Sequence, residues 1–307
     1  MALAQPGSFT LILATHGRGV YIVDDITPIR QITPEVLQSK LTVLENRPSP
    51  VRLAAGDQSF PGDDEFIGRN TPEVAFITYY MKERHTFGDF KIQVFDSSNQ
   101  LITTLPAGTR RGINRVEWPM RLKPPKVPPA ANIEFGSLSG PMVPEGTYTA
   151  KLVRGDESYT ATIQLVGDPA LPHSAAGRKL QQTTVMNLYR LIERLAFVDA
   201  QIVDARDQAE KRKLGAARAK FEELHKTLAA TREGQITGEE KIREQLGELY
   251  GDVSRYGGRP TQSQIDRAKV LEAEVDAASK SFDAEMSKLP ELKKLSKEEY
   301  DRRQKDR

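Results

Sequence analysis

The sequence predicts a multidomain protein in which an all-β part is followed by an all-α part. Over residues 73–168 the apolar side chains recur at every second position, as in strands that bury one face. From Ser174 onward they recur every three or four positions, as on one face of an α-helix. We therefore expect an immunoglobulin-like β-sandwich followed by a helical bundle or antiparallel coiled coil, with a β-hairpin before them.

The composition limits the classes of function. The 307 residues include 44 basic and 42 acidic side chains, so charge gives no reason to expect nucleic acid or an anionic membrane as partner. The absence of cysteine excludes disulfides, thiolate chemistry and cysteine-ligated zinc. No run approaches the roughly 20 apolar residues of a membrane span, and the first residues show no pattern of a secretion signal.

Residues 1–40 contain the predicted hairpin, in the run LILATHGRGVYIVDDITPIRQ. Two apolar segments flank His-Gly-Arg-Gly, whose glycines suit a tight turn. Near-continuous apolar runs are typical of strands covered on both faces. Because a lone hairpin is only marginally stable in water, we expect it to be covered by the sandwich, by Phe60 and Phe66, or by a second chain.

Residues 41–72 are predicted to form a connector, because proline, glycine and acidic residues interrupt any periodicity. Over residues 73–168 six or seven short runs rich in β-branched and aromatic residues predict the sandwich. The run KPPKVPPAANIEFGSLSGPMVPEG is interpreted as a long loop within this sandwich, since its prolines do not suit a central strand.

Residues 174–290 are predicted to form the helices. One apolar seam runs along Leu188, Leu191, Leu195, Val198, Ile202, Ala205 and Ala209. A restart is expected near Lys213–Gly215, and helix starts are expected at a capping box over 237–240 and at Thr261. The narrow seams favour packing within the chain, with a partner helix or a homo-oligomer as the alternative. Residues 291–307 are predicted to be a charged, frayed tail.

Five separated runs resemble, in the same order, the C-terminal region of bacterial BNR/Asp-box, sortilin-like "glycosyl hydrolase" proteins. The opening run is similar to their last propeller hairpin. The runs FPGDDEFIGRNTPEVAFITYYMK, GINRVEWPMR, PEGTYTAKLV and DPALPHS are similar to the region that follows the propeller. The resemblance covers nearly the whole chain. It implies a β-propeller blade remnant over residues 1–40, a flagellar-hook-cap-type sandwich, helices, and a secreted or periplasmic location.

The same resemblance carries no catalytic residue to this chain. The Asp-box pattern Ser-x-Asp-x-Gly-x-Thr-Trp does not occur in the sequence. The catalytic acids of such propellers lie on loops upstream of the matching region. We therefore expect a non-catalytic structural and interaction region whose partner is the parent propeller or another protein. The alternatives are a portion of a glycoside hydrolase with its active site upstream, and an accessory sandwich that binds carbohydrate.

Asp24 and Asp25 are the first candidate site residues. A glycosidase pair needs carboxyl groups about 5–10 Å apart across one sugar-sized gap. Neighbouring residues of a strand point to opposite faces, so we expect this pair to bind backbone amides of the next turn instead. Arg18, at the tip of the hairpin, is a candidate for binding a carboxylate.

Trp118 is interpreted as a core residue rather than a platform for a sugar, because it lies in an alternating strand. The histidines His16, His85, His173 and His225 lie far apart in the sequence, and none has a second ligand at metal spacing. We therefore predict neither a metal site nor a cofactor.

Overall fold

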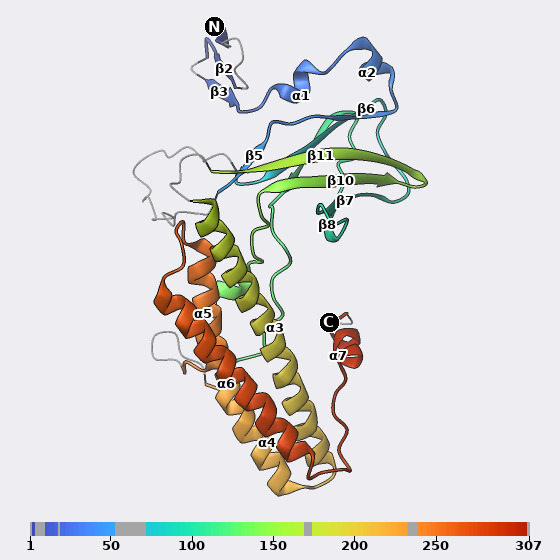
Figure 1. The fold of residues 1–307 in the computed structure, drawn as a ribbon. Coiled ribbons are helices and arrows are strands. Elements are labelled where there is room, and N and C mark those ends of the chain that lie inside the picture. Colours follow the sequence, from blue (N-terminus) through green and yellow to red (C-terminus); the bar gives the residue numbers. More distant parts are fainter. Residues whose placement is uncertain are drawn as a thin grey trace. The chain divides into compact units, whose positions relative to one another are not determined.

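The computed structural model describes residues 2–3, 10–17, 19–52, 72–168, 174–232 and 239–305. These fall into two compact units. The described residues of Met1–Arg52, Asp57–Leu122 and Met142–Leu171 form the first, here called the β unit. Those of Lys123–Pro141 and Pro172–Arg307 belong to the second, the helical unit. The predicted combination of strands and helices is confirmed (Figure 1).

The predicted hairpin is present in the β unit. Strands β1 (Ala2–Leu3), β2 (Leu11–Ala14) and β3 (Val20–Val23) form an antiparallel sheet in the order β1-β2-β3. Leu11 pairs with Val23, and the Thr15 amide donates to the Gly19 carbonyl at 2.8 Å to close the turn. Arg18, Phe60 and Phe66 lie outside the described residues.

The prediction of a connector over 41–72 is wrong for its first part. After α1 (Thr27–Arg30) and α2 (Pro34–Gln38), β4 (Leu41–Leu44) and β5 (Ser49–Val51) form strands. Each lies at the edge of a larger sheet. Pro50 is tolerated in β5 because an edge strand can lack one amide donor. Strands of three or four residues show almost no periodicity of apolar residues, so the sequence does not predict them.

Two sheets enclose one core in the β unit. The strands are β6 (Ala75–Met81), β7 (Phe90–Phe95), β8 (Leu101–Pro106), β9 (Gly112–Trp118), β10 (Gly146–Arg154) and β11 (Glu157–Gly167). One sheet has the order β5-β11-β10-β7-β8 and the other β4-β6-β9. Trp118 is fully buried between them, with its ring 5.1 Å from that of Tyr148. Its interpretation as a core residue is therefore confirmed.

The helical unit contains α3 (Ala175–Lys211), α4 (Gly215–Leu228), α5 (Ile242–Arg255), α6 (Gln262–Met286) and α7 (Lys297–Lys305). The predicted seam of α3 is buried in a core to which α4, α5 and α6 also contribute. Figure 1 shows these three helices alongside α3. The predicted restart is confirmed, since α3 ends at Lys211 and α4 begins at Gly215. None of the described helices is long and apolar enough to cross a membrane.

The helix starts are confirmed at two positions and wrong at a third. The Ser174 hydroxyl accepts from the Gly177 amide at 3.0 Å, and the Thr261 hydroxyl accepts from the Gln264 amide at 3.2 Å. The helix start expected at 237–240 is wrong, because α5 begins at Ile242 with Lys241 as its N-cap. Of the expected box, residues 237 and 238 lie outside the described residues.

The segment Lys123–Pro141, here called the proline-rich segment, packs on α5 and not in the sandwich where it was predicted. It contains the short 3-10 helix η1 (Gly136–Leu138). Arg243 donates from Nε to the Pro128 carbonyl at 2.8 Å, and the Tyr250 hydroxyl donates to the Ser139 carbonyl at 2.9 Å. These side chains satisfy carbonyls that have no strand partner.

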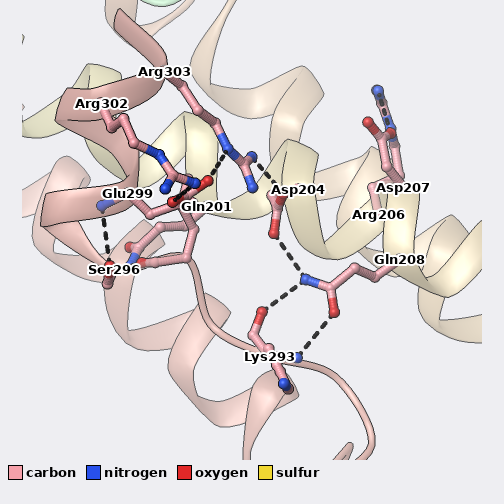
Figure 2. A network of polar contacts seen from close by, with 11 residues as sticks. Gln201, Asp204, Arg206, Asp207, Gln208, Lys293, Ser296, Glu299, Arg302 and Arg303 are labelled. Atoms are coloured by element: carbon pink, nitrogen blue, oxygen red, sulfur yellow. Dashed lines mark hydrogen bonds and ion pairs between the residues drawn. The ribbon is translucent and has the colours of Figure 1, made fainter.

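The predicted frayed tail is instead docked. Tyr300, on α7, is only 4% exposed, and the preceding Leu292 and Leu295 are buried as well. The Gln208 side chain of α3 donates to the Lys293 carbonyl at 2.8 Å and accepts from its amide at 3.0 Å (Figure 2). These three apolar side chains are enough to dock an otherwise charged segment, because α3 provides a surface on which they pack.

Candidate functional site

A hollow of about 180 Å³ in the β unit contains two of the four candidate residues, Asp24 and Asp25. It is lined by the residues that follow β3, the β4–β5 loop, the start of β6 and the outer face of β9. We call it the Arg115 hollow. Its volume is below the range of about 300–1,000 Å³ typical of sites for drug-sized ligands. It therefore suits a single small group, such as one sugar unit, rather than a nucleotide cofactor.

Asp24 and Asp25 both line this hollow, contrary to the expectation that they face apart. The strand β3 ends at Val23, so the alternation of strand side chains does not apply to them. Asp25 accepts from the Thr27 amide at 2.9 Å through Oδ1 and from the Arg47 amide at 3.1 Å through Oδ2. The prediction that this residue binds backbone amides is thus confirmed, and its carboxylate ties α1 to the β4–β5 loop.

Arg115 contributes a positive charge to the wall of the hollow. Its guanidinium carbon lies 3.3 Å from the centroid of the Phe76 ring, a close cation–π arrangement. Partial burial lowers the pKa of Arg115, and the negative charges of Asp25 and Asp24 oppose that effect. Because arginine stays protonated at any physiological pH, the Arg115 cation remains beside the carboxylates of Asp24 and Asp25 in this hollow.

These groups can bind a polar ligand. A guanidinium donates to hydroxyl or carboxylate oxygens, and a carboxylate accepts from hydroxyl groups. The arrangement does not resemble an acid–base pair, since both oxygens of Asp25 already accept from amides. Arg52, on the same rim, is paired with Asp168 at 3.8 Å.

The other candidate residues do not join this site. Trp118 has no exposed surface and cannot stack on a ligand. Arg18 lies outside the described residues. Sequence reasoning missed Arg115 and Phe76. The alternation in GINRVEW was a usable signal, because it places Arg115 on the face opposite the buried Asn114 and Trp118.

The β2–β3 hairpin is the second notable surface of the β unit. Val20, Tyr21 and Ile22 are 66%, 61% and 61% exposed, and Ile12 on β2 is 45% exposed. Neighbouring strand residues point to opposite faces, so apolar side chains are open to solvent on both faces of β3. Among the described residues, β3 is also an edge strand.

Comparison with known proteins gives no relative: no family model, no curated protein and no solved structure matches this chain.

Proposed function

We propose that the chain is a non-catalytic structural and interaction region of a larger, propeller-containing protein of the BNR/Asp-box, sortilin-like kind. The observation that carries the proposal is the exposure of apolar side chains on both faces of the β2–β3 hairpin. Inner strands of a propeller blade are covered on both sides by neighbouring blades. The hairpin has the composition of such a strand pair, and its partner is a propeller blade from the same protein or from another chain.

The β unit would serve as an immunoglobulin-like spacer. In support, its two sheets share a core that holds a tryptophan, Trp118. The Tyr148 hydroxyl also donates to the Pro144 carbonyl, four residues upstream, at 2.9 Å, a bond similar to that of a tyrosine corner. The helical unit would add a second surface for protein contacts.

The role of the hairpin in association is tested by replacing its exposed apolar residues with threonine, which keeps the preference for a strand. We expect the wild-type chain to associate with rising concentration in sedimentation experiments, because each covered side chain contributes about 1.5–3 kcal/mol. The triple variant Val20→Thr, Tyr21→Thr, Ile22→Thr should stay monomeric. A matched control, Leu101→Thr with Ile113→Thr, changes exposed apolar residues elsewhere in the β unit and should associate like the wild type. A wild-type chain that is monomeric throughout, with freely exchanging β3 amides, would refute the proposal.

Carbohydrate binding is a second candidate, favoured by the Arg115 hollow. Its cation, carboxylates and aromatic ring suit one acidic sugar unit. Glucuronate should bind in a calorimetric titration, glucose more weakly, and Arg115→Gln should abolish the difference. Equal affinity for glucuronate and glucose would exclude carbohydrate binding by the Arg115 hollow. Activity toward aryl glycosides that disappears in an Asp24→Asn, Asp25→Asn double variant would instead show a hydrolase.

A further inference from the structure

The helical unit contains a cavity of about 410 Å³ that the proposed function does not use. Its walls come from α3, from the end of α4, from the proline-rich segment and from the C-terminal residues around α7. We call it the His225 cavity. Its volume lies within the range of about 300–1,000 Å³ that is typical of small-molecule sites.

The polar part of the cavity is one buried pair. The Asp199 side chain on α3 is 1% exposed, and its Oδ1 lies 2.7 Å from Nδ1 of His225 on α4. A carboxylate is costly to bury without a partner, so this pair holds the imidazole in one orientation. The hydrogen bond that His225 donates to Asp199 also raises the pKa of His225, against the opposing effect of burial.

The arrangement leaves the second ring nitrogen available. With Nδ1 bound to Asp199, Nε2 lies on the other side of the ring, and the described residues supply no hydrogen-bond partner for it. The His225 side chain is 16% exposed and lines the cavity. An imidazole fixed through Nδ1 by a buried carboxylate is the usual way in which proteins present Nε2 to a ligand.

Apart from Gln304, the rest of the lining is apolar, or polar and already paired. Val127, Ala200 and Val203 provide aliphatic surface. Arg303 donates to Asp204 at 2.8 Å and to Glu299 at 2.9 Å, as Figure 2 shows. Arg206 is paired in the same way with Asp207 and Glu222. A charged ligand would therefore lose its hydration without gaining an unpaired counter-ion at this rim.

We propose that the His225 cavity binds a small uncharged ligand with an apolar body and one hydrogen-bond acceptor, of the class of aromatic ketones and esters. The acceptor oxygen takes a hydrogen bond from Nε2–H of His225, because the imidazolium, with Nδ1–H donated to Asp199, carries a proton on both ring nitrogens. The apolar body lies along Val127, Ala200 and Val203. The inference is independent of the hairpin and of the Arg115 hollow, because all its residues belong to the helical unit.

The test is a titration of the full chain with acetophenone, followed through the imidazole signals of His225 in carbon–proton NMR spectra. We expect a saturable shift of these signals. Toluene, which has the ring without the acceptor, should bind up to about tenfold more weakly. Benzoate should also bind more weakly, because its charge must be desolvated. The absence of a saturable shift with acetophenone, or equal affinity for toluene, would overturn the proposal.

A cavity-filling variant locates the binding. Ala200→Phe places a ring in the cavity and should abolish the shift, whereas Ala277→Phe, at an exposed position of α6, should leave it unchanged. An unchanged affinity in Ala200→Phe would show that acetophenone binds elsewhere and would overturn the proposal. The comparison of acetophenone with toluene uses the wild-type chain, so it decides the question even if Ala200→Phe does not fold.

Discussion

Replacing Gly136 by alanine tests whether the proline-rich segment is held on α5 by direct backbone contact. A Cβ atom at this position would lie 2.0 Å from the Gly247 carbonyl oxygen and 2.9 Å from its carbon. Both are backbone atoms of a helix and cannot rotate away. On the α5 side the approach is equally close, since a Cβ at Gly251 would lie 2.7 Å from Cα of Gly136. The alanine variant must therefore lift the segment away from the helix.

The expected loss of stability follows from these contacts. Overpacking of a tight site costs about 1–3 kcal/mol. Lifting the segment also breaks the hydrogen bond from Arg243 to the Pro128 carbonyl, and a bond to a charged group contributes about 1.5–3 kcal/mol. We expect the free energy of unfolding of the helical unit to fall by about 3 kcal/mol. The urea midpoint should then fall by about 1–3 M, given the usual dependence on denaturant.

The assay is urea denaturation followed by circular dichroism at the helical band. The emission of Trp118, the only tryptophan, reports separately on the β unit. Gly215→Ala is a matched control, because nothing lies within 4 Å of a Cβ at that helical position. Both variants exchange glycine for alanine and restrict the unfolded chain equally. We expect the control to be neutral or more stable by up to about 1 kcal/mol. If both variants unfold at the same urea concentration, the close contact with α5 does not exist.

Three further predictions concern the two cores and the C-terminal segment. The Asp199–His225 pair raises the pKa of His225. The contribution of this pair to the free energy of unfolding is therefore fully present below the unfolded pKa of about 6.5 and is lost as pH rises through the higher folded pKa. The urea midpoint of the helical unit should fall across this pH range, and Asp199→Asn should remove that pH dependence. Trp118→Ala should cost about 3–5 kcal/mol, measured by thermal unfolding, and easy quenching of native Trp118 emission by iodide would contradict its burial. Deleting residues 291–307 should lower the melting temperature of the helical unit, since three buried side chains contribute up to about 1.5–3 kcal/mol each; an unchanged melting temperature would mean that α7 is not docked.

Part of the candidate site could be predicted from sequence and part could not. The amide bonds of Asp25 were foreseeable, because an aspartate that follows a strand commonly caps the next turn. The presence of Arg115 beside it was not, because 90 positions separate the two residues in the chain. Only the pairing of β6 with β4 and β9 places Phe76 and Arg115 near the β4–β5 loop.

The sequence by itself determined the elements in which the periodicity of the apolar residues shows which face is buried. The apolar seam of α3, the restart at Gly215 and the alternating strand that buries Trp118 are all local patterns, because periodicity requires only neighbours in the chain. The tertiary structure alone decided the segments that lack such a pattern. Residues 41–51, the proline-rich segment and the C-terminal residues around α7 are short, rich in proline or highly charged. Their conformation depends on distant partners, namely β6 and β11, Arg243 and Tyr250, and the surface of α3, which provide the hydrogen bonds and apolar cover that these segments cannot provide for themselves.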